Sequence, residues 1–174
     1  YTPSGVLNAA DLYDKYVNRE VKQAIPYPWE GLNKKLYGLR RGELVTLTGG
    51  TGLGKSSITR ELEHWMITNT TDNVGIVALE EDYLRTMDCL LSIEASARLY
   101  INEIRDDYPK DKMKAMHDKL FKDDRVWIHS HFGATDVEEI FSKLRFMIVG
   151  CDCKWVVVDH LHMLLSASAD GDER

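Results

Sequence analysis

One stretch constrains what this chain can fold into more than any other, an octapeptide rich in glycine. Its residues are Gly49, Gly50, Thr51, Gly52, Leu53, Gly54, Lys55 and Ser56. They fit the pattern G-x-x-x-x-G-K-[ST] of a phosphate-binding loop. Glycines let the backbone curl so that successive N–H groups point at an anion. The N-terminus of a following helix adds partial positive charge.

The motif assigns a role to each of its last residues. Lys55 can reach the β- and γ-phosphates of a nucleotide, and the hydroxyl of Ser56 can bind Mg²⁺. Ser57 follows directly and opens the next segment. The octapeptide and Ser57 therefore predict a nucleotide-binding site.

The segments on both sides of the octapeptide have the apolar patterns that the motif requires. Residues 43–48 read Glu-Leu-Val-Thr-Leu-Thr and predict a buried strand that runs into the loop. Residues 57–69 leave the loop with an apolar stripe spaced for one face of a helix. The stripe consists of Ile58, Leu62, Trp65 and Met66. Because a strand and a helix flank the loop in the expected order, a chance match is disfavoured.

Length, charge and cysteine content narrow the class of protein. A chain of 174 residues predicts one domain with a sizeable core. The net charge of −6 argues against a wholly basic nucleic-acid binder, but allows a basic groove or a channel built by several subunits. Three cysteines without a C-x-x-C pair predict neither a disulfide framework nor a zinc site, and reduced cysteines fit a cytosol-like compartment. No apolar run reaches about 18 residues, so no transmembrane helix is expected, and no signal peptide is visible.

The rest of the chain alternates predicted strands with predicted helices. Strands are expected at residues 73–79, 125–129 and 155–159, and helices at 83–105, 110–122 and after Thr135, whose capping-box partner is Glu138. The last of these helices has a stripe made of Val137, Ile140, Phe141, Leu144 and Ile148. Continuously apolar strands are typical of a parallel sheet covered by helices on both faces. The predicted fold class is therefore α/β with a mostly parallel sheet.

The N-terminal segment has a weaker pattern. Residues 1–20 are expected to be a linker in which Asn8 caps a short helix that ends near Arg19. The apolar stripe of this helix is narrow, so the helix would be marginal alone. It packs either on its own domain or on a neighbouring subunit, and the pattern leaves both open. Residues 21–42 are expected to be irregular, because Pro26 and Pro28 break regular structure.

A phosphate-binding loop needs a carboxylate that helps to hold Mg²⁺. Asp159 ends the most hydrophobic predicted strand. In an open α/β sheet, ligands bind beyond the carboxyl ends of the strands. We therefore expect Ser56 and Asp159 to share the metal ion, in the arrangement called Walker A and Walker B. The alternative is that Asp159 only ends a strand and caps a loop.

Hydrolysis also needs a base that orients water. Glu80 ends the strand expected at residues 73–79, where it can reach water in line with the γ-phosphate. Because successive side chains alternate in direction, only one of Glu80 and Glu81 faces the site easily. We predict Glu80 as the base and expect Glu81 or Asp82 to cap the next helix. His160 follows the Walker B position and is a candidate for contact with the nucleotide or with residues around it.

Several motifs along the chain combine into one family pattern. They are Gly31-Leu32-Asn33, the run from Gly38 to Leu44, the octapeptide, Leu79-Glu80-Glu81, Val158-Asp159-His160, and a loop with Ser166-Ala167-Ser168 and Asp172-Glu173-Arg174. This order and spacing resembles the DnaB-type (superfamily 4) hexameric replicative helicases, and most of all the helicase domain of T7-like phage primase-helicases. The likeness covers roughly Leu7 to Arg174.

The resemblance implies a RecA-like P-loop fold, a ring of usually six subunits, and Mg²⁺-dependent hydrolysis of ATP or dTTP. It implies coupling of hydrolysis to 5′-to-3′ movement on single-stranded DNA. The Walker roles fall on Lys55, Ser56 and Asp159, and the catalytic glutamate role falls on Glu80. These assignments agree with the interpretation of the residues themselves.

The resemblance also divides the chain and implies partners. Residues 1–20 would be the linker whose helix docks on a neighbouring subunit, and residues 21–174 the N-terminal part of the ATPase domain. The loop with Ser166, Ser168 and Arg174 would face the central DNA channel. A primase domain and a replicative polymerase are expected partners, and the host cytoplasm is the expected location if the protein comes from a phage.

The family pattern continues beyond what this sequence contains. Its polar sensor residue, further DNA loops and arginine finger are expected after residue 174, so the chain by itself is expected to bind nucleotide weakly and to unwind nothing. Two other interpretations stay open: a RecA- or KaiC-like recombinase or signalling ATPase, and a nucleotide-binding assembly module without hydrolysis. The presence of both Glu80 and Asp159 argues against the assembly module, because a pure binder has no use for a base that activates water.

Overall fold

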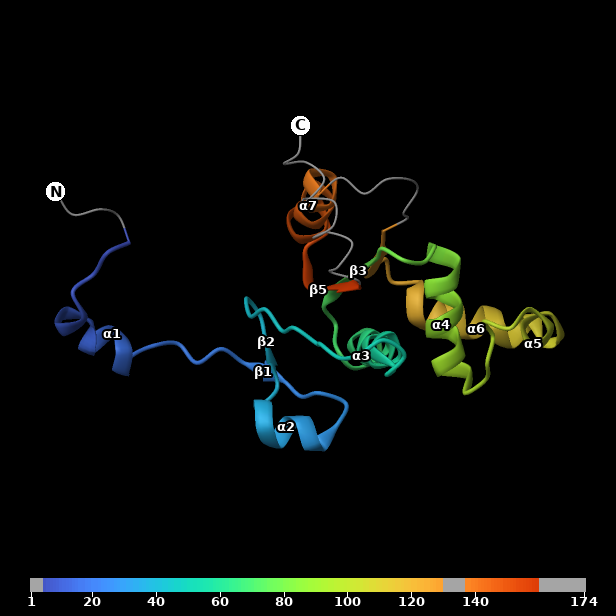
Figure 1. Cartoon of the computed structure of the whole chain (residues 1–174), viewed down its shortest axis with the longest axis horizontal. Helices are drawn as coiled ribbons and strands as arrows, with labels where there is room; N and C mark the ends of the chain where they lie inside the picture. Colours follow the sequence, from blue (N-terminus) through green and yellow to red (C-terminus); the bar gives the residue numbers. More distant parts are fainter. Residues whose placement is uncertain (1–4, 130–136, 160–174) are drawn as a thin grey trace. The chain divides into compact units, whose positions relative to one another are not determined.

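The computed structural model describes residues 5–129 and 137–159 of the chain. Two compact units are formed, Tyr1–Glu43 and Leu44–Arg174 (Figure 1). Among the described residues, no helix is long and apolar enough to cross a membrane.

The first unit begins with the predicted helix. The side chain of Asn8 accepts a hydrogen bond from the backbone N–H of Ala10 at 3.1 Å and opens a 3₁₀ turn, η1 (Ala9–Leu12). The chain continues as α1 (Tyr13–Val17). The predicted cap is confirmed, and the helix ends near the expected residue. None of the residues in these two elements is buried, as expected for a narrow apolar stripe.

The expectation that residues 21–42 are irregular is wrong. β1 (Ala24–Ile25) pairs antiparallel with β2 (Leu39–Arg40), and α2 (Glu30–Leu36) lies between them in the sequence. The side chain of Asn33 ties α2 to the proline segment, because it accepts from the N–H of Tyr27 at 2.6 Å and donates to the carbonyl of Tyr27 at 2.8 Å. The prolines therefore end β1 without preventing a helix directly after them.

The second unit is built on a three-stranded parallel sheet. Its strands are β3 (Asn73–Ala78), β4 (Val126–Ile128) and β5 (Cys153–Asp159), in the order β4-β3-β5. The central strand β3 is the most deeply buried, with Val74, Ile76 and Val77 fully inaccessible. Strands buried on both faces have the near-continuous apolar sequence from which the parallel sheet was predicted, and the predicted α/β class is confirmed.

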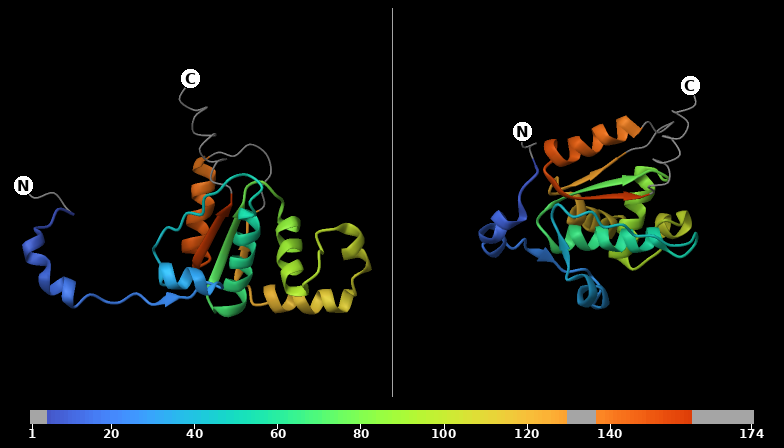
Figure 2. Two further views of the ribbon diagram at one scale, coloured as in Figure 1. Left: turned by 60° about the horizontal axis from the view of Figure 1, so that its bottom comes forward. Right: turned by 60° about the vertical axis from the view of Figure 1, so that its left-hand side comes forward.

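Helices cover both faces of this sheet. The helical elements of this unit are α3 (Lys55–Asn69), α4 (Tyr83–Ala95), α5 (Asn102–Asp107), α6 (Lys110–Phe121), α7 (Val137–Arg145) and a π-helical turn η2 (Phe146–Gly150). Figure 2 shows α7 on one face of the strands and α3 on the opposite face. This three-layer arrangement positions the start of α3 beside the sheet.

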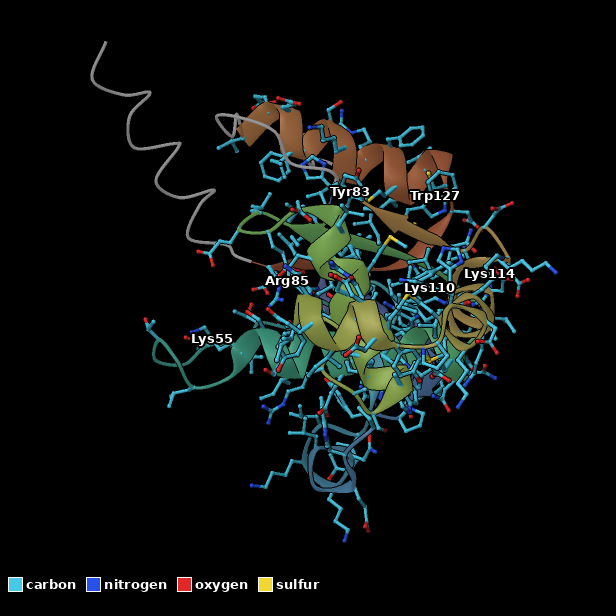
Figure 3. All side chains as sticks on the ribbon, turned by 90° about the vertical axis from the view of Figure 1, so that its right-hand side faces the viewer. Lys55, Tyr83, Arg85, Lys110, Lys114 and Trp127 are labelled. Atoms are coloured by element: carbon cyan, nitrogen blue, oxygen red, sulfur yellow. The ribbon has the colours of Figure 1, made fainter. Side chains whose placement is uncertain are left out.

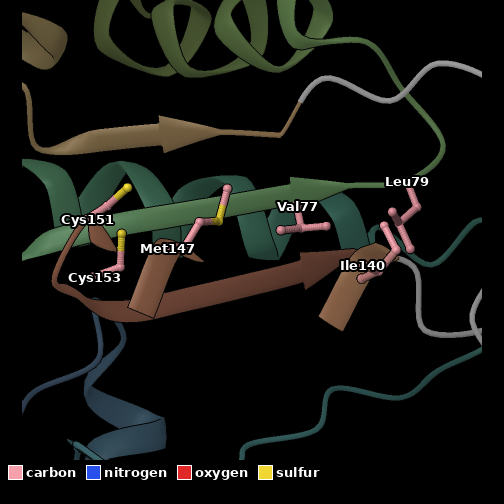
Figure 4. Packing of buried hydrophobic residues seen from close by; sticks show 6 residues of the cluster. All are labelled: Val77, Leu79, Ile140, Met147, Cys151 and Cys153. Carbon is pink, nitrogen blue, oxygen red and sulfur yellow. The ribbon is translucent and has the colours of Figure 1, made fainter. Parts of the chain in front are cut away.

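The core between α7 and the sheet is apolar and closely packed. Its buried members are Val77, Leu79, Ile140, Met147, Cys151 and Cys153, and Figure 4 shows them between β3, β5 and the helical segment. Gly75 of β3 packs against this core without room for a side chain. A Cβ atom at Gly75 would lie 2.9 Å from Met147 Sδ and 3.3 Å from Val156 Cγ2.

The strand predicted at residues 43–48 is not formed. A strand is stabilised by the backbone hydrogen bonds of a neighbouring strand, and within the described ranges no strand pairs with this segment. Leu44 is 94% exposed, and Val45 and Leu47 are also exposed. The outer part of β5 is only half-buried, against the expectation that this strand is apolar and covered on both faces.

The predicted long helix at residues 83–105 is two helices. Ser96 adopts a left-handed φ of +50° and ends α4, and the N–H groups of Ser96 and Ala97 bond back to carbonyls of α4. A residue in this conformation terminates a helix in the way described for C-terminal caps. α5 then begins at Asn102 and ends at Asp107, two residues after the expected end of the single helix.

Two predicted apolar stripes face the core only in part. On α3 the buried residues are Arg60, Glu63, Met66 and Ile67, whereas the expected Ile58 is 40% exposed. On α7 Ile140 is buried, but Phe141 is about half exposed, as is Ile148 in η2. Met147 is buried in place of Ile148, within the wider π-helical turn that the sequence pattern did not predict.

The close approach at Gly75 gives a test of this packing. We expect Gly75→Ala to lower the free energy of unfolding by about 1 to 3 kcal/mol, because the added methyl group displaces Met147 from the core. Urea unfolding followed by tryptophan fluorescence measures the change. Gly150→Ala is the matched control, since its Cβ would also approach Phe146 at 2.9 Å but against an exposed ring that can turn away. Equal losses in the two variants would contradict the packing described here.

Candidate nucleotide-binding site

The glycine-rich octapeptide forms an open loop that ends at the N-terminus of α3. Gly52 and Gly54 have φ values of +77° and +84°, a conformation that residues with a Cβ rarely adopt. Nothing lies within 4 Å of the Cβ positions of these two glycines, so the backbone is accessible. Gly54 is also the N-cap residue of α3 and supplies no side-chain hydrogen bond to the first turn. The loop thus presents a helix N-terminus of the kind that binds anions.

Lys55 curls back over the beginning of this loop. Its Nζ atom donates to the carbonyls of Gly49 and Gly50, each at 2.9 Å. Figure 3 shows Lys55 at the end of α3 from which the loop extends, on the same side of the molecule as Arg85. The ammonium group is therefore held against the residues that the sequence predicts to surround a phosphate.

The loop lies at the carboxyl edge of the parallel sheet. Figure 2 shows the chain that leads into α3 on the side to which the arrows of β3 and β5 point. The ladder of these strands ends with Ala78 opposite Asp159, and the N–H of Leu79 donates to the carbonyl of Asp159 at 2.7 Å. Asp159 is the last residue of β5, and Glu80 comes just after the end of the adjacent strand β3. Both residues therefore lie at the edge of the sheet that faces the loop.

Ser56 and Asp159 have the chemistry of a magnesium site. A hydroxyl and a carboxylate are hard oxygen ligands, and Mg²⁺ is usually held by one or two carboxylates together with substrate phosphates. Ser56 is exposed in the first turn of α3, and Asp159 is half-buried at the end of β5. In residues 5–129 and 137–159, no group of three or more His, Cys, Asp or Glu side chains is arranged to hold a metal ion.

The three acidic residues after β3 have different surroundings. Asp82 caps α4, because its carboxylate accepts from the N–H of Arg85 at 2.8 Å. Glu81 accepts from Arg60 at 2.5 Å and from the hydroxyl of Thr86 at 2.8 Å. Glu80 is exposed at the sheet edge. The predicted helix cap is confirmed for Asp82, while the half-buried carboxylate of Glu81 pairs with Arg60.

The sequence patterns did not predict the buried ion pair between Arg60 and Glu63. Arg60 and Glu63 lie three residues apart on α3, on the face turned to the sheet, where an apolar stripe was expected. The guanidinium donates to both carboxylate oxygens of Glu63 at 2.7 and 2.6 Å. The i, i+3 spacing of Arg60 and Glu63 indicates that the two side chains can pair. It does not indicate burial, because such pairs are common on the solvated faces of helices.

Burial raises the pKa of Glu63 to about 7. Its carboxylate is fully desolvated, and the charges of Asp159 and Glu81 raise the pKa further, while Arg60 opposes the change. α3 also packs against β5, the strand that ends with Asp159.

A cavity of about 520 Å³ opens beside the loop, between α3 and α4. Serine and arginine side chains line much of it: Ser56, Ser57, Arg60, Arg85 and Arg98. Lys55 and Asp159 are not among its lining residues, so this cavity adjoins the phosphate-binding loop without including the predicted metal position.

Some predicted site residues lie outside the described part of the chain. They are His160, Ser166, Ser168 and Arg174, together with Thr135, the predicted cap of α7. Their assignments stay predictions.

The loop, the helix that follows it and the parallel sheet define a P-loop α/β protein. Residues 24–174 match the DnaB-like helicase C terminal domain. The match covers most of the chain, which therefore belongs to this family and has its RecA-like fold.

A curated relative supports the same assignment. The DNA helicase/primase of Enterobacteria phage T3 is 29% identical over 185 aligned residues, which include the whole of this chain. The chain spans 32% of the length of that relative.

The raised pKa of Glu63 makes stability depend on pH. The folded state binds a proton at Glu63 more tightly than the unfolded state, whose carboxyl has an ordinary pKa of 4.5. This contribution to stability is therefore complete below pH 4.5 and is lost as pH rises toward 7. Each unit of pKa difference corresponds to about 1.4 kcal/mol, so roughly 2 to 3 kcal/mol is expected between pH 5 and 8.

Urea unfolding of the wild type and of Glu63→Gln isolates this effect. The wild type should lose more stability than the variant between pH 5 and pH 8, because glutamine does not titrate. Parallel pH curves for the two proteins would show that Glu63 stays ionised throughout.

Proposed function

We propose that this chain is part of the motor of a replicative DNA helicase of the phage primase-helicase type. Its octapeptide, with Gly52 and Gly54 at positive φ before α3 and Lys55 folded over the loop, is the observation that carries the proposal. Membership of the DnaB-like helicase family and the likeness to the T3 helicase/primase support it. The substrate is ATP or dTTP, and residues 49–57 bind its phosphates.

Each residue at the sheet edge then has a chemical role. Lys55 exchanges the carbonyls of Gly49 and Gly50 for phosphate oxygens and neutralises the negative charge that develops during phosphoryl transfer. Glu80, exposed beside the end of β3, accepts a proton from the attacking water. The carboxylates of Glu81 and Asp82 have structural roles, because Glu81 binds Arg60 and Asp82 caps α4.

A magnesium ion completes the site. Bound Mg²⁺ would supply positive charge that stabilises the phosphates during transfer, and Ser56 and Asp159 would hold it. Asp159 stays at the sheet edge because its own carbonyl is tied to Leu79. His160, directly after it, would contact the nucleotide or the residues around it.

Hydrolysis would drive 5′-to-3′ movement on single-stranded DNA by a ring of subunits, six in the usual case. The segment 1–20 would link subunits, since Tyr13, Tyr16 and Val17 of α1 expose apolar surface. The loop with Ser166, Ser168 and Arg174 would face the DNA channel. A primase domain and a replicative polymerase would be partners of the whole protein in the host cytoplasm.

Two variants of the full-length protein test the assigned chemistry. Lys55→Ala should lower nucleotide hydrolysis at least about 100-fold and weaken nucleotide binding, because the phosphates lose their cation. Glu80→Gln should lower hydrolysis by about 10² to 10⁴-fold but leave the affinity for nucleotide nearly unchanged, because only proton transfer is lost. Phosphate release and binding of a fluorescent nucleotide measure the two effects.

Glu103→Gln on α5 is the matched control, since Glu103 is an exposed carboxylate away from the loop, and its activity should equal the wild type. Normal turnover by Glu80→Gln would refute the role of Glu80.

A separate assay distinguishes the classes of motor protein. Phosphate release stimulated by single-stranded DNA, with displacement of a duplex strand, supports a helicase. Strand exchange without unwinding would indicate a recombinase instead.

A further inference from the structure

A cluster of polar side chains is buried between α3 and the turn that joins β3 to α4. We call it the Arg60 cluster; its members are Arg60, Glu63, Glu81 and Thr86. Arg60 is 4% exposed, Glu63 and Thr86 are fully buried, and Glu81 is half-buried. The proposed roles of the sheet edge use none of these four side chains.

The guanidinium of Arg60 connects two elements of the candidate site. Its NH1 group donates to both oxygens of Glu63 on α3, at 2.7 and 2.6 Å. Its NH2 group donates to Glu81 Oε1 at 2.5 Å, and the hydroxyl of Thr86 on α4 donates to the same oxygen at 2.8 Å. The helix that starts at Lys55 is thereby joined to the residue that directly follows Glu80.

Stability alone does not account for this cluster. Arg60 Nε is buried and has no hydrogen-bond partner among the described residues, and Glu63 is removed from water completely. Buried ion pairs are often no more stabilising than apolar side chains of similar volume, because desolvation offsets their attraction. What the rigid, planar guanidinium does provide is a fixed geometry between Glu63, bound through NH1, and Glu81, bound through NH2.

Glu80 lies between two residues that have such contacts. On one side of Glu80, Leu79 is buried and its N–H is bonded to the carbonyl of Asp159 at 2.7 Å. On the other side, Glu81 is held by Arg60. Glu80 is thus an exposed residue between two anchored neighbours, one tied to the strand of the predicted metal ligand and the other to the helix of the phosphate-binding loop.

We propose that Arg60 is a positioning residue for Glu80: clamped by Glu63 on α3, it holds Glu81 and thereby fixes the turn that presents Glu80 to the γ-phosphate. This rests on the proposed function, in which Glu80 activates water. Arg60 touches neither water nor nucleotide in this role and acts through Glu81. The proposal concerns geometry, so it affects turnover and not nucleotide affinity.

Arg60→Lys and Glu81→Gln in the full-length protein test the proposal. Lysine keeps the charge but cannot bind Glu63 with two hydrogen bonds while reaching Glu81. We expect each variant to lower kcat for nucleotide hydrolysis about 10- to 100-fold, because small displacements of catalytic groups have effects of this size. The dissociation constant of a fluorescent nucleotide should change less than about 3-fold in both.

A third measurement separates positioning from a general loss of structure. In a Glu80→Gln background, Arg60→Lys should cause no further loss of turnover, because the residue that it positions no longer acts as a base. A further 10-fold loss in that background, or a parallel loss of nucleotide affinity, would overturn the proposal. Should Arg60→Lys fail to fold, Glu81→Gln at the half-buried end of the cluster carries the same test.

Controls keep this result distinct from a failure of the proposed function. Arg105→Lys changes another arginine that pairs with a carboxylate of α4, Asp88 at 3.1 Å, and neither residue belongs to the Arg60 cluster; its kcat should equal the wild type. Full turnover by Glu80→Gln would refute the base itself, whatever Arg60 does. Full turnover by Arg60→Lys and Glu81→Gln, with an inactive Glu80→Gln, would refute only the positioning role.

Discussion

The parallel pairing of β3 with β5 is the constraint on which the candidate site depends. Its register ends with Ala78 opposite Asp159, and the N–H of Leu79 extends the ladder by one bond to the carbonyl of Asp159. Because both strands run in the same direction, the residues that follow them share one edge of the sheet. A shift of one residue would turn Asp159 to the opposite face and separate it from the loop.

The two faces of the sheet are stabilised in different ways. Under α7 the contacts are apolar, among Val77, Leu79, Met147 and their neighbours. Under α3 the buried face includes Arg60 and Glu63, whose pairing connects to Glu81. The apolar face supplies the burial that stabilises the fold, while the polar face orders the residues around the carboxyl edge. This division explains why a helix next to a phosphate-binding loop carries charges where its period predicts apolar residues.

The sequence predicted the parts of the fold that have strong local signals. The apolar run at residues 73–79 and the glycines of the octapeptide have few alternative structures, and both occur where expected. The strand at 43–48 failed because strand formation depends on a neighbour that local sequence does not specify. The end of α4 at Ser96 was not predicted, because a serine in a left-handed conformation has no clear signal in sequence.

The candidate site, like the fold, was predictable from the sequence only where the signal is local. The octapeptide, Glu80 and Asp159 follow from motif spacing and from strand ends, but the contacts of Arg60 with Glu63 and Glu81 depend on how α3 rotates against the sheet. The predicted apolar stripe, with Ile58 and Leu62 facing the core, corresponds to a different rotation of α3 about its own axis. Long-range pairs such as Arg60–Glu81 require the folded structure.

Magnesium-dependent nucleotide binding tests the central claim that the loop and the sheet edge form one site. A fluorescent nucleoside triphosphate is titrated into the wild type and into Asp159→Asn, with Mg²⁺ and with a chelator. We predict that Mg²⁺ tightens binding to the wild type at least about 10-fold and that Asp159→Asn removes most of this gain. Equal dependence on Mg²⁺ in the two proteins would place the metal away from β5 and contradict the account.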